Sequence, residues 1–162
     1  MIRCAVPDDA PGIVRVMQVI ASERKHSAID TAWSVEDQAR YIRNQSNREA
    51  IHIALDENGG VVGLQILERW ASALESTSHV GQLGTFILPE WRRRGMGRQL
   101  WECTAAFARQ ARYRKLAIYV RASNEKAQAF YSALGFRVCG RLARQVVIDD
   151  VEDDEIVMEV FL

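Results

Sequence analysis

The sequence predicts a mixed α/β fold whose central sheet is mostly antiparallel and contains one parallel strand pair. Apolar segments within residues 51–87 are separated by turn signals, which is typical of antiparallel strands. Residues 80–120 show the order strand, helix, strand, which is typical of a βαβ unit with parallel strands. Apolar residues at helical spacing recur in both halves of the chain, so that helices must pack on the sheet.

The chain opens with a predicted strand and two predicted helices. Residues 2–6 alternate between apolar and polar side chains and end at a proline, as an edge strand does. Asp8 or Asp9 is placed to cap the first helix. Ser34, with an acidic residue three positions later, resembles a loose capping box that opens a helix extending to about residue 44.

Three antiparallel strands are predicted next. The glycines within residues 56–60 favour a hairpin turn, because glycine adopts positive φ at little cost. A polar loop over residues 71–78 separates the second of these strands from the third. The strands are expected at residues 51–55, 61–70 and 80–87.

The second half of the chain has a different rhythm. Asn124 is placed to cap the last helix, and Gly135 is placed to end it in a left-handed conformation. Two final strands flank an acidic turn. The expected elements are a helix at residues 97–111, a strand at 115–120, a helix after residue 124, and strands at 137–141 or beyond and at 155–162.

Length and charge restrict the class of protein. The chain has 162 residues, a usual length for one domain, and we expect residues 1–162 to form that domain. Lys and Arg total 21, as do Asp and Glu, so the formal net charge is zero. Proteins that bind nucleic acid usually carry a basic excess, so nucleic acid is not an expected partner.

Cysteine usage and hydropathy indicate a cytoplasmic protein. Cys4, Cys103 and Cys139 are far apart in the sequence, which predicts reduced, mostly buried thiols and neither a disulfide framework nor a metal site. The sequence shows no signal peptide, and no apolar run reaches the about 18 residues that a membrane helix needs. We therefore expect no metal and no membrane partner.

A basic turn containing two glycines lies between the third of these strands and the helix that follows. Its sequence is Arg92-Arg93-Arg94-Gly95-Met96-Gly97. Free N–H groups at a helix start attract anions, glycine permits close approach, and arginine favours phosphate. The turn is therefore a candidate pyrophosphate site, with an ordinary basic surface turn as the alternative. The dinucleotide fingerprint and the P-loop pattern are both absent.

This turn resembles the signature of the GCN5-related N-acetyltransferase (GNAT) family. The family pattern R/Q-x-x-G-x-G/A is matched by the turn, and the preceding Ile87-Leu88-Pro89 is similar to the family's V-x-P. A second block is similar to the family's N-x-x-A-x-x-x-Y-x-x-x-G-F. Its matching residues are Asn124, Ala127, Tyr131, Gly135 and Phe136.

The resemblance implies a GNAT-like acyl-CoA N-acyltransferase fold, with a twisted sheet, a splayed parallel pair and helices on both faces. It also implies acetyl-CoA as cosubstrate. Backbone groups of Phe86, Ile87 and Leu88 would bind the pantetheine. The pyrophosphate would lie on the amides of Arg92, Arg93, Arg94, Gly95, Met96, Gly97 and Arg98. Glycine often stands in the family where this chain has Arg93, so the set of donating amides is open.

Two further residues have roles implied by the resemblance. Tyr131 would contact the cofactor and be the general acid that protonates the leaving thiolate, the alternative being a core tyrosine whose hydroxyl binds water. Asn124 caps the last helix, reaches the cofactor or a bound water, or does both.

The proton acceptor for the attacking amine is not obvious. A primary amine has a pKa of about 10.4 and must lose a proton at neutral pH. Many relatives have a glutamate on the strand before the turn, whereas residues 81–87 contain no carboxylate. Glu68 is the candidate base, its alternative being a solvated strand end. Glu75 and His79 follow it, and Gln82 is a candidate holder of a relay water.

The acceptor pocket is expected to have mixed polar and aromatic walls, with contributions from His26, Trp33 and Trp70. The acidic run over residues 149–155 either attracts a cationic amine or forms a solvated hairpin turn. These features do not choose among an amino acid, a polyamine, an aminoglycoside and a protein N-terminus.

The sequence thus predicts an acetyl-CoA-dependent N-acetyltransferase that acts on the primary amine of a small molecule by direct attack. One alternative is an acyl-CoA-binding sensor or interaction module without catalysis, which the missing strand carboxylate favours. A second alternative is an acetyltransferase of protein amines. A homodimer is a family-level expectation.

Overall fold

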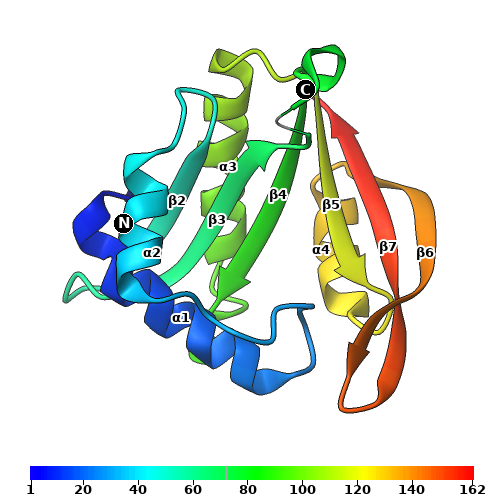
Figure 1. Cartoon of the computed structure of the whole chain (residues 1–162), viewed down its shortest axis with the longest axis horizontal. Coiled ribbons are helices and arrows are strands. Elements are labelled where there is room, and N and C mark those ends of the chain that lie inside the picture. The colour runs from blue at the N-terminus through cyan, green and yellow to red at the C-terminus, as the bar shows by residue number, and fades with distance from the viewer. Residues whose placement is uncertain (72) are drawn as a thin grey trace.

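A seven-stranded sheet with helices packed on both faces is the framework of the chain (Figure 1). The computed structural model describes residues 1–71 and 73–162. The strands are β1 (Ile2–Cys4), β2 (Ala50–Leu55), β3 (Val61–Arg69), β4 (Val80–Ile87), β5 (Lys115–Arg121), β6 (Arg137–Ile148) and β7 (Val151–Phe161). The helices are α1 (Ala10–Glu23), α2 (Val35–Arg43), α3 (Met96–Gln110) and α4 (Glu125–Ala133).

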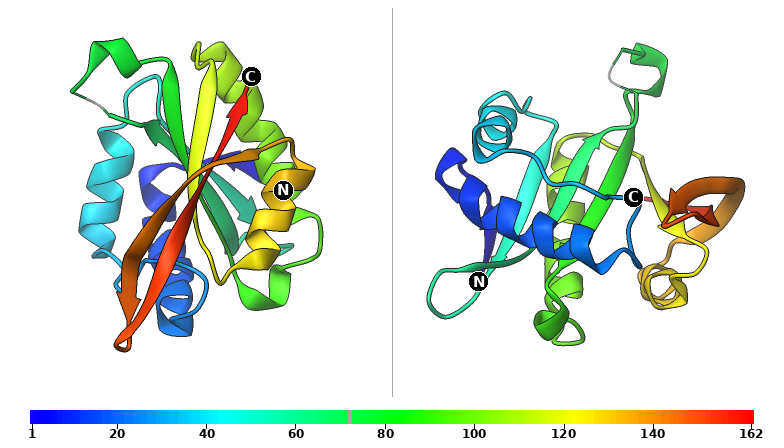
Figure 2. Two further views of the ribbon diagram at one scale, coloured as in Figure 1. Left: turned by 90° about the vertical axis from the view of Figure 1, so that its right-hand side faces the viewer. Right: turned by 60° about the horizontal axis from the view of Figure 1, so that its bottom comes forward.

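The sheet order is β1-β2-β3-β4-β5-β7-β6. Among these described strands, β4 and β5 form the one parallel pair, so the predicted fold class is confirmed. Helices α1 and α2 cover one face of the sheet, and α3 and α4 cover the other (Figure 2). The apolar core divides into one cluster centred on β2, β3 and α1 and a second centred on β5, β7 and α4.

The parallel pair separates part of the way along its length. Pairing begins at Val80 and Lys115 and ends at Leu83 and Ile118. Strand β4 continues to Ile87 and β5 to Arg121, and the two diverge toward the lower edge of the sheet in Figure 1. The facing backbone edges beyond the last pair are therefore left for another binding partner.

Several local expectations are confirmed. The Ser34 side chain accepts a hydrogen bond from the Asp37 N–H at 3.0 Å and caps α2. The Asn124 side chain accepts from the Ala127 N–H at 3.2 Å and caps α4. Gly135 follows Leu134, the C-cap residue of α4, and has a φ of 94°.

The expectation that Asp8 or Asp9 caps α1 is wrong. A 3₁₀ turn over Pro7–Asp9 leads directly into α1, so the Asp9 carboxylate points back along the chain. It accepts from the Val6 N–H at 2.8 Å and from both terminal nitrogens of Arg3, at 2.6 and 2.7 Å. The carboxylate therefore ties the 3₁₀ turn to β1.

The expected burial of the cysteines is also wrong. Cys4 and Cys139 are exposed and Cys103 is partly buried, although all three thiols are free. Cys4 lies on β1 and Cys139 on β6, the two edge strands of the sheet, where side chains have fewer neighbours.

The acidic segment forms less of a turn than expected. The chain turns at Asp149 and Asp150, and β7 begins at Val151. The predicted loop over residues 71–78 contains a 3₁₀ turn at Glu75–Thr77, and residue 72 of that loop lies outside the described residues. No helix in the described part of the chain is long and apolar enough to cross a membrane.

Candidate functional site

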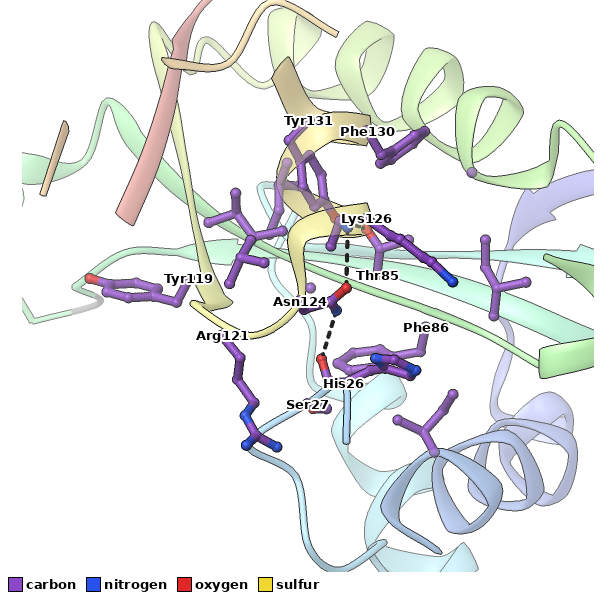
Figure 3. A pocket seen from close by; sticks show the side chains of 18 of the residues that line it. His26, Ser27, Thr85, Phe86, Tyr119, Arg121, Asn124, Lys126, Phe130 and Tyr131 are labelled. Carbon is purple, nitrogen blue, oxygen red and sulfur yellow. Dashed lines mark hydrogen bonds between the residues drawn. The ribbon is translucent and has the colours of Figure 1, made fainter. Parts of the chain in front are cut away.

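A cavity of about 1550 Å³ lies where β4 and β5 part. Strands β3, β4 and β5, the turn before α3, helix α4 and the segment after α1 all contribute to its walls. Figure 3 shows side chains of the segment after α1, of β4 and of α4, among them His26, Thr85 and Tyr131, around one space. Because the gap between the strands opens to both faces of the sheet, groups from opposite faces reach the same cavity.

The backbone of β4 has free hydrogen-bonding groups in this gap. Leu88, just beyond the strand, donates its N–H to the Val62 carbonyl at 3.0 Å, and the β3–β4 register is unbroken up to that point. Hydrogen-bonding direction alternates along a strand, so Thr85 and Ile87 direct their backbone groups away from β3 and into the gap. The Ile87 carbonyl accepts a hydrogen bond from Arg92 Nε at 2.9 Å. The Ile87 N–H and the backbone N–H and carbonyl of Thr85 are therefore the groups that remain to bind a ligand in the gap.

The turn before α3 presents backbone N–H groups to the cavity. Gly95 is the N-cap residue, with a φ of 81° and no side chain to bond the N–H groups of the first turn. The first turn also has no acidic residue. Gly95, Gly97 and Arg98 line the cavity. The helix start therefore has the open, partly positive amides that bind phosphate groups.

Arg92 holds this turn against α1. Its Nη1 donates to Glu23 Oε1 at 2.8 Å, and its Nη2 bonds the other carboxylate oxygen. The guanidinium beside it lowers the pKa of the Glu23 carboxyl below the ordinary value. Much of the Arg92 charge is thus matched within the chain, although the side chain also lines the cavity.

The other basic side chains of the turn differ in placement. Arg93 and Arg98 are exposed and line the cavity, as does Lys126 of α4. Arg94 instead stacks on Trp91, with its guanidinium carbon 5.1 Å from the ring centre. Arg121 of β5 lines the cavity as well, so its cations come from the turn, α3, α4 and β5. Met96 packs in the apolar core.

Tyr131 lies at the end of a buried polar chain. It is 3% exposed, and its hydroxyl donates to Thr85 Oγ1 at 2.7 Å. Gln65, which is 0% exposed, donates its Nε2 to the same oxygen at 2.7 Å. Burial raises the pKa of Tyr131 well above its ordinary value, against a smaller lowering by the Thr85 hydrogen bond. Tyr131 is therefore protonated at neutral pH.

Glu68 enters the cavity from the opposite face of the sheet. It is paired in register with Gln82, and both line the cavity with Tyr119. Its Oε1 accepts a hydrogen bond from the Tyr41 hydroxyl. Burial, followed by this bond to a carboxylate, raises the pKa of Tyr41, so Tyr41 remains a donor that fixes the carboxylate.

Of the other residues expected on the acceptor side, His26 lines the cavity, whereas Trp33, Trp70, Glu75 and His79 are not among its described lining residues. Trp70 Nε1 donates to the Tyr119 hydroxyl at 3.1 Å, and the Trp33 ring meets the Tyr41 ring edge-on at 5.3 Å between centres. Glu75 is exposed and pairs with Arg69 at 3.6 Å. His79 lies just before β4.

The segment after α1 is bound to the start of α4, and both contribute to the cavity wall. Asn124 Nδ2 donates to the His26 carbonyl at 3.1 Å, while its Oδ1 caps α4 (Figure 3). Arg24 pairs with Asp149 at 2.7 Å. Residues 26–29 line the cavity and are here named the strap.

The acidic run is largely matched by arginines. Its members Asp149, Asp153 and Asp154 pair with Arg24, Arg121 and Arg141. Glu155 alone among residues 149–155 appears on the described cavity wall, and burial raises its pKa. Of the two alternatives for this run, the structure shows the exposed hairpin turn, at Asp149 and Asp150, and adds ion pairs with arginines.

The sequence analysis did not identify Gln65, Thr85, Tyr41 or Lys126 as site residues. Gln65 could have been found from the sequence, because it is a polar residue inside the apolar segment between Gly63 and Leu67. A polar residue that is buried in this way is uncommon and indicates a specific role. Tyr41 had no comparable signal. No group of three or more His, Cys, Asp or Glu side chains in the described ranges could hold a metal ion.

Comparisons with a protein-family model and with solved structures both point to GNAT acetyltransferases. The model of the Acetyltransferase (GNAT) family matches residues 17–136. The structure is similar to that of an acetyltransferase of the GNAT family from Streptococcus pneumoniae, with 23% identity, a TM-score of 0.92, and coverage of 100% of this chain and 99% of that one.

Two other solved structures are similarly close. A phosphinothricin acetyltransferase from Sinorhizobium meliloti in complex with acetyl-CoA is 20% identical, with a TM-score of 0.91 and coverage of 100% and 88%. A ribosomal-protein-alanine N-acetyltransferase from Brucella melitensis is 23% identical, with a TM-score of 0.91 and coverage of 100% and 99%. At these identities the likeness shows the fold alone. A search of curated proteins gave no match.

Proposed function

The chain belongs to the acetyltransferase (GNAT) family, and from that premise we propose that residues 1–162 form one domain that transfers the acetyl group of acetyl-CoA to a primary amine of a small molecule. The single observation that supports this most is the cavity at the parting of β4 and β5, which joins an open helix start, Tyr131 and Glu68. A phosphate-bearing thioester and an amine can meet in such a space.

The residues present fit acetyl-CoA. The N–H groups at the start of α3, with Arg93, Arg98 and Lys126 nearby, would hold the pyrophosphate. The Thr85 backbone and the Ile87 N–H would bind the amide groups of the pantetheine as an added strand does. The resemblance implies Phe86, Ile87 and Leu88 for this contact. Alternation along β4 favours Ile87 among these three and adds Thr85.

Acid and base act from opposite faces of the sheet. Acetyl-CoA, when bound, supplies an activated acetyl thioester. Glu68 accepts one proton from the protonated amine, whose neutral nitrogen then bonds to the acetyl carbon and loses its second proton to solvent. Tyr131 donates its hydroxyl proton to the sulfur, which leaves with the electron pair of the broken C–S bond. Both residues then exchange protons with solvent, so the products are an amide and a free thiol.

A small acceptor is favoured over a protein by the strap. Residues 26–29 form part of the cavity wall and are bound to Asn124, which also lines the cavity. A protein terminus would have to enter beneath this segment or displace it. Acetylation of protein amines remains the competing outcome in the experiment.

The test is thiol release from acetyl-CoA with a panel of small amines, measured for the wild type and Tyr131→Phe. We expect turnover of at least one amine and a loss of about 100-fold in kcat for the variant. Tyr113→Phe is the matched control, since it removes a buried hydroxyl that donates to the Arg48 carbonyl, away from the cavity.

Other results identify the alternatives. Turnover of peptides but not of free amines indicates an acetyltransferase of protein amines. A rise in Tm with CoA, without turnover of either class, indicates a sensor that binds CoA. If CoA leaves the Tm unchanged, the proposal that this cavity binds the cofactor is refuted.

A further inference from the structure

A hydrogen-bonded chain of three side chains crosses from β3 to α4, and two of its members, Thr85 and Tyr131, line the cavity. Gln65 of β3 and Thr85 of β4 are directly paired in register, so their side chains share the face on which α4 lies. Gln65 Nε2 and the Tyr131 hydroxyl each lie 2.7 Å from Thr85 Oγ1. Thr85 therefore joins the buried amide to the phenol.

The number of hydrogens in this chain allows two arrangements. The amide of Gln65 donates to Thr85, which occupies one lone pair of the Thr85 oxygen. In one arrangement Tyr131 also donates to Thr85, and its hydrogen points away from the cavity. In the other Thr85 donates to Tyr131, and the phenolic hydrogen is free to point into the cavity. Rotation of two hydroxyl hydrogens converts one into the other without moving a heavy atom.

We propose that Thr85, held by Gln65, is a positioning residue that donates its hydroxyl hydrogen to Tyr131 while Tyr131 transfers its proton to the leaving sulfur. The inference rests on the proposed function, in which Tyr131 is the acid. The Thr85 hydrogen bond stabilises the phenolate formed by the transfer, and the Gln65 amide keeps the Thr85 oxygen in the accepting role that makes this donation possible.

The position of Gln65 is costly for a merely structural residue. Its neighbours Leu64 and Leu67 are fully buried, and Gln65 Oε1 is buried without a hydrogen-bond partner among the described residues. An apolar side chain would fill the same space without leaving a polar atom unpaired. The buried, unpaired oxygen of Gln65 destabilises the fold, and its presence is explained if the Gln65 amide nitrogen is needed to hold Thr85 beside Tyr131.

The first experiment compares kcat and KM for Thr85→Val, Thr85→Ser and Gln65→Leu, each alone and combined with Tyr131→Phe. Thr85→Val keeps the shape of the side chain and removes the hydroxyl, and we expect kcat to fall about 10-fold with KM unchanged. Thr85→Ser restores the hydroxyl and the rate. Neither Thr85→Val nor Gln65→Leu lowers the residual rate of Tyr131→Phe, because both act through the phenol.

A second readout does not depend on turnover. Replacement of Tyr131 by 3,5-difluorotyrosine brings ionisation of the phenol into the range that absorbance and fluorine NMR can follow in the folded protein. Loss of the Thr85 hydroxyl should raise the pKa of that phenol, and Thr85→Ser should return it. Thermal unfolding of each variant identifies any that fail to fold, in which case Gln65→Leu and Thr85→Ser carry the comparison.

The outcomes separate this inference from the proposed function. An unchanged kcat and an unchanged phenol pKa in Thr85→Val overturn the inference, as does a further loss of rate in the Tyr131→Phe background. Full activity of Tyr131→Phe, or no turnover of any amine by the wild type, overturns the proposed function, and the phenol pKa still decides whether Thr85 stabilises ionised Tyr131.

Discussion

Gly97 and Phe130 come so close at the cavity rim that a Cβ atom on Gly97 would lie 2.9 Å from Cζ of the Phe130 ring. Gly97 belongs to the first turn of α3, and Phe130 belongs to α4. The contact sets how near the two helices approach. It gives the second glycine of the basic turn a packing role, in addition to the close ligand approach expected from the sequence.

Gly97→Ala should displace the Phe130 ring and weaken CoA binding. Overpacking destabilises a fold by about 1–3 kcal/mol. Alanine has a higher helix propensity than glycine, which offsets about 1 kcal/mol or less of that loss near a helix start. We expect a net loss of about 1 kcal/mol in the free energy of unfolding, measured by urea denaturation. Phe130→Leu in the same chain should recover most of the loss, and an additive double mutant would contradict the contact.

Arg93 occupies a left-handed backbone conformation, with a φ of 63°. A side chain there costs about 1 kcal/mol that glycine avoids, so Arg93→Gly should unfold at higher urea than Arg93→Ala. Both variants lose a cation that lines the cavity, so CoA affinity should fall equally in the two. Arg98→Ala is the control for charge alone. Equal stability of the glycine and alanine variants would refute the strain.

The ion pair of Arg92 and Glu23 should make stability depend on pH. Because Arg92 lowers the pKa of Glu23 in the folded state, the pair stabilises the fold at pH above the ordinary carboxyl value of 4.5. This contribution is lost as the pH falls through the lower folded value. Glu23→Gln should therefore cost about 1 kcal/mol at neutral pH and progressively less below pH 4.5.

Urea unfolding at several pH values measures that difference. Glu57→Gln, in the exposed turn between β2 and β3, is the matched control and should show no such loss. A Glu23→Gln penalty that stays constant down to acid pH would show that packing, and not charge, ties the turn to α1.

Glu68→Gln should impair turnover most at neutral pH. The variant keeps the shape and the Tyr41 contact but cannot accept a proton, so kcat/KM should fall about 100-fold. The difference should narrow as the pH approaches the amine pKa of about 10.4, where the acceptor is already neutral. Glu75→Gln is the control, since Glu75 is exposed and bound to Arg69. A pH-independent deficit would exclude a base role.

The parts of this site that could be predicted from sequence are those that local rules control. Gly95 and Gly135 have the positive φ that their positions require, and Asn124 caps α4 as its type predicts. The βαβ order predicted the parallel pair. Asp9 was misassigned because a 3₁₀ turn before the helix turned its carboxylate toward Arg3, which a local capping rule does not contain.

The parts that could not be predicted depend on register between strands and on contacts between distant segments. Gln65 and Thr85 meet because β3 and β4 pair in one register, and a shift of one residue would place them on opposite faces. Glu23 and Arg92 are 69 positions apart, and Arg24 and Asp149 are 125 apart. The sequence therefore shows where the basic turn and the acidic run lie, but not which distant residues pair with them.

Asn124 has two functions in this structure, and one substitution separates them. Asn124→Asp keeps the oxygen that caps α4 but removes the Nδ2 donor that binds the His26 carbonyl. Asn124→Ala removes both and should cost about 1 kcal/mol of stability through loss of the cap. The aspartate variant should keep wild-type stability while amide hydrogen exchange in residues 26–29 becomes faster. Unchanged exchange in that variant would mean that the contacts of Arg24 with Asp149 and Arg121 are enough to hold the strap in place.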